Sequence, residues 1–196
     1  MKQTLSSDDN LDAILDLLGC DIIGGAFTHL NRLGAGGTAT VFAHPTRMDL
    51  VVRVSDYPDG WFQYAHDLAS DDGGPHYGPQ VHEMTCVNDV WVALATRLQE
   101  LPFDIETYAR LGAARRIICP DHYGEATPGD IEMIEGDQPG FCDFADRHLA
   151  GARDLTDENF MTDGVRLIVN DPFRGMSLFD AERLAQIHSS PLKSAA

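Results

Sequence analysis

The stretch from Asp154 to Phe173 holds the residues best suited to chemistry in this chain of 196 residues. Asp154 is followed by an amide, Asn159, and a second acid, Asp171, comes after an apolar run. Metal-dependent phosphoryl transfer needs such a set. One carboxylate orients and deprotonates the attacking hydroxyl, while an amide and a second carboxylate hold magnesium against the phosphates. These residue types in this order indicate a phosphotransferase site.

The elements that must position these side chains are a turn predicted at residues 162–164 and a β-branched strand predicted over residues 165–170. That strand would carry Asp171 to the end of a hairpin whose other arm starts near Asn159. The two predicted metal ligands would then face one point. The alternative interpretation is an acidic loop, a hairpin and a surface turn, because Asp and Asn are common in loops.

A glycine-rich segment lies upstream. Gly34, Gly36 and Gly37 fall between two predicted strands, over residues 27–33 and 38–44. Glycine lets a backbone approach phosphate closely and donate its N–H groups to the oxygens. A plain glycine-rich β-turn is the alternative, because the motif is weak by itself and this copy is imperfect.

A further strand is predicted over residues 50–54, and its alternation places Val52 and Val54 on one face and Arg53 on the other. The glycine-rich hairpin, the strand with its cation and the Asp/Asn/Asp set thus follow one another along the chain. This order is the layout of protein kinases.

The chain resembles the protein-kinase superfamily. It is more closely similar to the early serine/threonine protein kinases of short-tailed lytic bacteriophages. The more specific points are the pair His44-Pro45 after the glycines and the pair Asp171-Pro172, which stands where most kinases have Asp-Phe-Gly. The matching stretches are residues 41–45, 51–54, 159–161 and 169–172.

The resemblance implies ATP and Mg²⁺ as cofactors. It implies that Asp154 is the catalytic base and that Asn159 and Asp171 bind magnesium, while Arg53 and the glycine backbone contact the phosphates. Kinases have a lysine where this chain has Arg53, and arginine differs because its charge lies on a larger, planar fork. A helix glutamate pairs with that lysine in kinases, and Asp67 is the candidate for that partner here.

The pattern predicts an α+β, bilobal protein-kinase-like fold with a five-stranded antiparallel sheet and a minimal helical lobe. The predicted domains are an N-terminal helical extension over residues 1–25, a sheet lobe over 26–98 and a reduced helical lobe over 99–196. Strands are further predicted over 80–87 and 89–95, a crossover over 96–101, helices over 8–18, 60–70, 104–118, 141–150 and 178–188, and an acidic, turn-rich segment over 127–138.

The helix predicted over residues 104–118 ends in Arg115 and Arg116, which would complement the negative end of the helix dipole. Contact with a phosphorylated segment is the alternative role for this pair. The buried stripe of this helix is predicted to consist of Ile105, Tyr108, Leu111 and Ala114.

The composition is that of a globular chain, with 43% hydrophobic residues and a formal net charge of −17. This charge argues against direct binding to nucleic acid or an anionic membrane, because both would repel it. It indicates either solubility or a basic partner. The cysteines lack a C-x-x-C pair, so we expect reduced thiols in a cytoplasmic protein, which would be the host cytoplasm for a phage protein.

Three functional hypotheses follow. The first is a serine/threonine protein kinase that phosphorylates host proteins and, by resemblance, acts in shutting off host transcription. The second is a kinase-derived acidic protein that inhibits a host enzyme, such as RNA polymerase, by direct binding. It is favoured by the charge, by Arg53 in place of lysine and by the short stretch after Phe173. The third is a small-molecule phosphotransferase.

Overall fold

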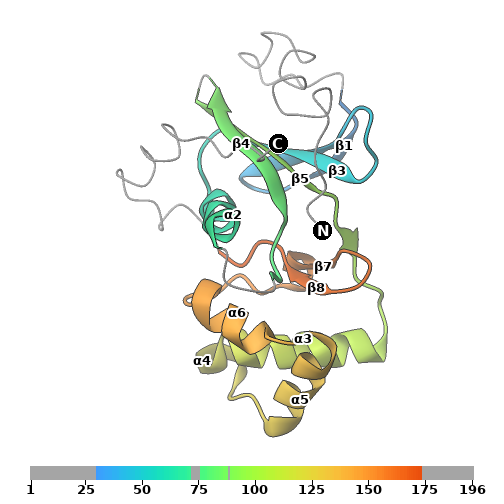
Figure 1. Ribbon diagram of the computed structural model, residues 1–196, viewed down its shortest axis with the longest axis vertical. Coiled ribbons are helices and arrows are strands. Elements are labelled where there is room, and N and C mark those ends of the chain that lie inside the picture. The colour runs from blue at the N-terminus through green and yellow to red at the C-terminus, as the bar shows by residue number, and fades with distance from the viewer. Residues whose placement is uncertain (1–29, 72–75, 88, 174–196) are drawn as a thin grey trace. The chain divides into compact units, whose positions relative to one another are not determined.

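The structure is a computed structural model, and it describes residues 30–71, 76–87 and 89–173 (Figure 1). The predicted extension over residues 1–25 and the predicted helix over 178–188 lie outside the described residues. Within them the chain divides into two units, residues 30–59 with 80–97 and residues 60–79 with 98–173. The predicted domain boundary between residues 98 and 99 stays a prediction.

The first unit contains a five-stranded antiparallel sheet, as predicted. Its order is β1-β2-β3-β5-β4, so the last hairpin adds to β3 through its second strand. This sheet confirms the predicted α+β fold class. The strands are β1 (Arg32–Ala35), β2 (Ala39–Ala43), β3 (Leu50–Ser55), β4 (Val81–Val87) and β5 (Val90–Thr96).

One face of β3 supplies the centre of the apolar core in this unit. Leu50, Val52 and Val54 are buried and form one cluster with side chains from β2 and β5. Burial of alternate residues is the pattern predicted from the sequence. Arg53 therefore belongs to the other face of the strand.

His44 closes the turn between β2 and β3. Its Nδ1 accepts hydrogen bonds from the backbone N–H groups of Thr46 at 3.2 Å and Arg47 at 3.0 Å. A ring nitrogen that accepts hydrogen bonds carries no proton, so this turn fits the tautomer protonated on Nε2. The His-Pro pair that contributed to the kinase resemblance thus has a structural role in the sheet.

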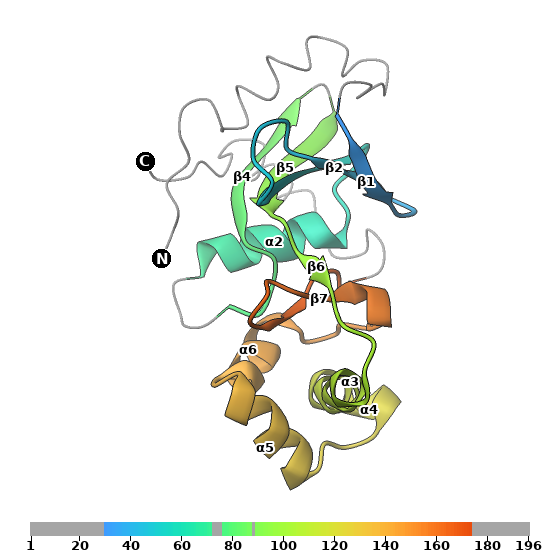
Figure 2. The ribbon, with the colours of Figure 1, turned by 90° about the vertical axis from the view of Figure 1, so that its right-hand side faces the viewer.

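The second unit combines helices with a small sheet, and α3, α5 and α6 pack against one another (Figure 2). The helix α2 (Gly60–Ser70) has the bounds predicted from the sequence. The sequence predicted the hairpin that forms β7 and β8, but not β6, which pairs with β7 and completes a three-stranded sheet in the order β6-β7-β8. The other elements are β6 (Gln99–Glu100), α3 (Ile105–Ile118), α4 (Pro120–Tyr123), α5 (Pro128–Asp137), α6 (Phe141–His148), β7 (Phe160–Thr162) and β8 (Leu167–Val169).

Helix α3 confirms the predicted segment but corrects its buried stripe. Asp104 caps the helix by accepting a hydrogen bond from the N–H of Thr107 at 2.7 Å. Leu111 is buried as predicted, together with Ala114, whereas Ile105 is 91% exposed and Tyr108 is 49% exposed. The stripe is exposed at its start because only the second half of α3 enters the apolar cluster of this unit.

Helix α5 lies where an acidic, turn-rich segment was predicted, so that prediction was wrong. Thr127 Oγ1 accepts a hydrogen bond from the Asp130 N–H at 3.2 Å, and Asp130 Oδ2 accepts one from the Thr127 N–H at 2.8 Å. These reciprocal bonds form a capping box, and Pro128 occupies the first helical position, where a missing N–H costs nothing. The proline and glycines that indicated turns therefore belong to a helix start.

Asp130 gives this unit an acid-sensitive contact. The Arg116 guanidinium, followed by the N–H and hydroxyl of Thr127, holds the pKa of Asp130 far below its ordinary 3.8. A carboxylate with a depressed folded-state pKa contributes stability above its unfolded pKa and loses it as the pH falls toward the folded value. We expect Asp130→Asn to lower Tm, with the largest difference from wild type near neutral pH and a shrinking difference below about pH 4.

Thermal unfolding at several pH values checks this expectation. The matched control is Glu132→Gln, because Glu132 is an exposed acid on the same helix. We expect the control to follow wild type at every pH. A Tm difference for Asp130→Asn that stays constant down to pH 3 would contradict the assignment.

Candidate active site

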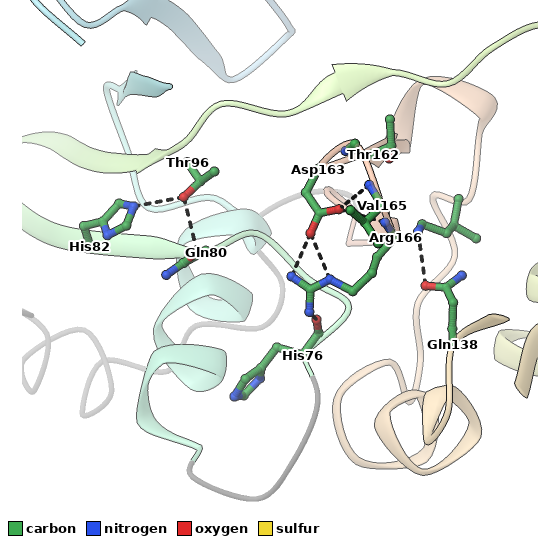
Figure 3. Close-up of polar contacts among 11 residues, drawn as sticks. His76, Gln80, His82, Thr96, Gln138, Thr162, Asp163, Val165 and Arg166 are labelled. Atoms are coloured by element: carbon green, nitrogen blue, oxygen red, sulfur yellow. Dashed lines mark hydrogen bonds and ion pairs between the residues drawn. The ribbon is translucent and has the colours of Figure 1, made fainter. Parts of the chain in front are cut away.

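The β7–β8 hairpin is held by side-chain hydrogen bonds to its backbone (Figure 3). Asp163 Oδ1 accepts from the N–H groups of Val165 at 2.9 Å and Arg166 at 2.7 Å. These N–H groups are used within the turn, so they are not available to a strand ladder. The predicted turn is therefore confirmed, but the strand predicted over residues 165–170 is shortened to β8, Leu167–Val169.

Further contacts fix this hairpin within the second unit. Gln138 Oε1 accepts from the Leu167 N–H at 3.1 Å, and Arg166 Nη1 donates to the His76 carbonyl at 3.0 Å (Figure 3). The Val169 carbonyl accepts from the Tyr64 hydroxyl at 3.1 Å. The strand that leads to Asp171 is thus tied both to α2 and to the segment that precedes α6.

Hydrogen bonds join the segments that carry the predicted site residues. Asp154 N donates to the Pro172 carbonyl at 3.1 Å, and Asn170 N donates to the Asn159 carbonyl at 2.8 Å. The side-chain Nδ2 of Asn159 donates to the Asp154 carbonyl at 2.7 Å. Asp171 lies between the two bonded residues of its own segment. The structure therefore brings together the segments that carry Asp154, Asn159 and Asp171, and the predicted roles of these residues stay a prediction.

The side-chain oxygen atoms of Asn159 and Asp171 are of the kind that magnesium binds. Because the Asn159 Nδ2 donates to a carbonyl, Oδ1 is the atom of this amide that a cation would bind. Asp171 adds a carboxylate. The pKa of Tyr64 is raised mainly by the burial of its hydroxyl group, and the negative charge of Asp171 raises this pKa further. Mg²⁺ binds oxygen ligands and commonly takes one or two from protein and the rest from phosphate and water. The residues present thus fit Mg²⁺.

Within the described ranges, no group of three or more His, Cys, Asp and Glu side chains is placed to hold a metal ion. The candidate magnesium ligands are one amide and one carboxylate, so they do not form a group of that kind.

The predicted phosphate loop lies in the first unit. Gly36 and Gly37 form the turn between β1 and β2, and Gly36 N donates to the Ala39 carbonyl at 2.9 Å. Gly34, Gly36 and Gly37 do not have left-handed φ angles, and a Cβ added to any of them would meet no described atom within 4 Å. The packing of the loop itself therefore does not require glycine. The predicted approach of this backbone to phosphate stays a prediction.

Arg53 makes a buried ion pair with Asp59 that was not predicted from the sequence. Its Nη2 lies 2.7 Å from Asp59 Oδ2, and the exposed fractions of the two side chains are 10% and 4%. The same carboxylate oxygen accepts from Thr38 Oγ1 at 2.8 Å, at the base of the glycine loop. Asp59 is the last residue of the short connection from β3 to α2. This position close to Arg53 in the sequence is the feature that could have indicated Asp59 as its partner. The predicted contact between Arg53 and Asp67 stays a prediction.

A pocket of about 350 Å³ lies entirely within the second unit, beside the segment that carries Asn159. Its wall combines apolar side chains with the carboxylates of Glu100, Asp157 and Glu158. Such a wall suits an apolar group that carries positive charge. The other lining residues are Leu101, Pro102, Phe103, Thr107, Tyr108, Leu111, Phe160 and Met161.

No protein-family model matches the sequence, and no curated protein matches it. Among solved structures, aminoglycoside phosphotransferase APH(4)-Ia is similar at 15% identity over 85% of this chain and 73% of that chain, with a TM-score of 0.40. A thermostable mutant of that enzyme, in ternary complex with AMP-PNP and hygromycin B, is similar at 14% identity over 81% and 70%, with a TM-score of 0.42. The Mycobacterium tuberculosis PknI kinase domain is similar at 17% identity over 72% and 57%, with a TM-score of 0.40.

The topology of the chain itself defines a protein-kinase-like α+β fold. A glycine-bearing turn joins β1 to β2 of a five-stranded sheet, a buried cation lies on β3, and α2 follows β3 and precedes β4 in chain order. Downstream, the Asp/Asn/Asp set is held together in the second unit. None of the helices in the described ranges combines the length and apolar character that a membrane span needs.

Proposed function

We propose that this protein is a phosphotransferase that uses ATP and Mg²⁺ and, more narrowly, a serine/threonine protein kinase of the lytic-phage type that acts on host proteins. The observation that carries the proposal is the hydrogen-bonded joining of the Asp154, Asn159 and Asp171 segments. The narrower statement, including a role in host takeover in the host cytoplasm, rests on the resemblance of the sequence motifs.

Each site residue has a distinct role in the proposal. Asp154 would accept the proton of the attacking hydroxyl as the new oxygen–phosphorus bond forms, while Asn159 and Asp171 would hold Mg²⁺. The bound metal supplies positive charge against the phosphate oxygens. Arg53 and the backbone of the glycine loop would bind the phosphates.

Calorimetry with Mg–ATP tests the proposal on wild type and Asp171→Ala. We expect wild type to bind Mg–ATP and the variant to bind it more than about tenfold more weakly, because a metal ligand is lost. Without magnesium, the two proteins should bind ATP equally. The control is Asp143→Ala, which removes an exposed acid on α6. Failure of wild type to bind Mg–ATP would overturn the kinase proposal.

A second candidate function is an acidic inhibitor that binds a basic surface of a host enzyme, such as RNA polymerase. The net charge of −17 favours it, and so does a phosphate-site arginine already paired with a buried acid. In that case inhibition of the enzyme would survive Asp154→Ala and weaken steeply with added salt. If the protein instead acts as a kinase, its effect on the host enzyme should be lost in Asp154→Ala.

A further inference from the structure

Arg115, in the last turn of α3, contacts the segment that carries Asp154 and Asn159. Its Nε donates to the Leu155 carbonyl at 2.7 Å, and its Nη2 forms an ion pair with the Asp157 carboxylate. The guanidinium carbon also lies 5.6 Å from the centre of the Phe160 ring, within the range of a cation–π contact.

These contacts bracket the proposed catalytic segment. Leu155 directly follows Asp154 and Phe160 directly follows Asn159, so one guanidinium touches the neighbours of both residues. Leu155 and Phe160 are themselves almost fully buried in the apolar cluster of the unit. The contacts of Arg115 thus act on this segment in addition to the hydrogen bond between Asn159 and Asp154.

The half of α3 that carries Arg115 is packed in the apolar cluster of the second unit. Leu111 and Ala114 anchor the same half of α3 in the apolar cluster, and the Arg115 side chain is only 19% exposed. A second ring, that of Tyr123, lies 5.8 Å from the guanidinium carbon. The Arg115 side chain is thus also held by contacts outside the catalytic segment.

We propose that Arg115 is a positioning residue that holds Asp154 and Asn159 in the geometry needed for phosphoryl transfer. This inference rests on the proposed function. Arginine suits the task because its planar fork donates in two directions at once, to a backbone carbonyl and to a carboxylate. A lysine would keep the charge but has no fork to satisfy both acceptors.

The chain offers a matched control in the next residue. Arg116 lies on the same turn of α3 and forms the same kind of ion pair, but with Asp130 on α5 and not with the catalytic segment. Loss of Arg116 therefore removes a comparable tertiary contact and leaves the contacts of Arg115 in place.

The experiment compares Arg115→Met, Arg115→Lys and Arg116→Met with wild type in the full chain. ADP formation at saturating Mg–ATP, with water as the acceptor, gives turnover, and calorimetry gives Mg–ATP affinity. Hydrogen exchange over residues 154–160 gives the order of the segment. Thermal unfolding shows that each variant is folded.

We expect Arg115→Met to lower turnover by about 10- to 100-fold with little change in Mg–ATP affinity, because a displacement of about 1 Å can have this effect. Arg115→Lys should show most of the same loss, and both should speed exchange over residues 154–160. Arg116→Met should lose thermal stability but keep turnover and slow exchange.

Equal losses of turnover in Arg115→Met and Arg116→Met would overturn the inference. Exchange over residues 154–160 that stays at the wild-type rate in Arg115→Met would also overturn it. If wild type neither binds nor hydrolyses ATP, the proposed function fails. The exchange comparison then decides by itself whether Arg115 holds this segment.

Discussion

Replacing Asp154 with asparagine is expected to lower ATP turnover by about 10²- to 10⁴-fold while Mg–ATP binding is kept. The substitution removes the carboxylate but keeps the shape of the side chain. The position of residue 154 depends on its backbone, since its N–H donates to Pro172 and its carbonyl accepts from Asn159. The substitution should therefore slow the chemical step and leave nucleotide binding unchanged.

ADP formation and calorimetry on the same protein preparation check this result. Glu158→Gln is the control, because Glu158 is an exposed acid on the same segment. The control should turn over ATP at the wild-type rate. An Asp154→Asn protein with wild-type turnover would remove the proposed base from the mechanism, and a matching loss in Glu158→Gln would show a general effect of charge.

Asp59→Ala is expected to lower the free energy of unfolding of the first unit by about 3–5 kcal/mol, the range for removal of one partner from a buried ion pair. Asp59 is 3% exposed, and its Oδ2 contacts both Arg53 and Thr38. Alanine removes both contacts in one step. Thr38→Val removes only the hydroxyl contact and should cost about 1 kcal/mol.

Urea unfolding followed by tryptophan fluorescence can measure this loss. The chain has two tryptophans, Trp61 in the second unit and Trp91 in the first, so a Trp61→Phe background reports on the first unit. In the double variant Arg53→Met with Asp59→Leu, stability should largely return, because apolar side chains replace both members of the pair. A loss in Asp59→Ala no larger than that in Thr38→Val would contradict the ion-pair assignment.

Much of the fold could be predicted because local patterns determine it. The bounds of α2 follow from helical spacing of apolar residues, and β2, β3, β4 and β5 follow from alternation between turns. Segment 127–138 was misassigned because Pro and Gly suggested a turn, whereas the deciding information was the Thr127–Asp130 capping box. The exposure of Ile105 depends on where α3 meets the core, which helical spacing does not encode.

Part of the candidate site could be selected from the sequence. Asp154, Asn159 and Asp171 were selected because their types and order are chemically specific, and the hydrogen bonds of the second unit join their segments. Their roles stay a prediction. Asp59 and Arg115 could not be identified in this way. Their importance comes from contacts made only after folding. The sequence indicated Arg115 only as a cation at the end of a helix, and the position of Asp59 just before α2 does not reveal its partner.

The second unit is interrupted in sequence, since residues 80–97 of the first unit separate α2 from the rest. During synthesis α2 leaves the ribosome well before β8, whose Val169 carbonyl accepts the Tyr64 hydroxyl. At about 5–20 residues per second, the roughly 100 residues between these partners take about 5–20 s to make. The sheet of the first unit can close once Thr96 has emerged, whereas Tyr64 and Leu68 of α2 lack most of their partners in the apolar cluster of the second unit until residues up to Val169 have followed.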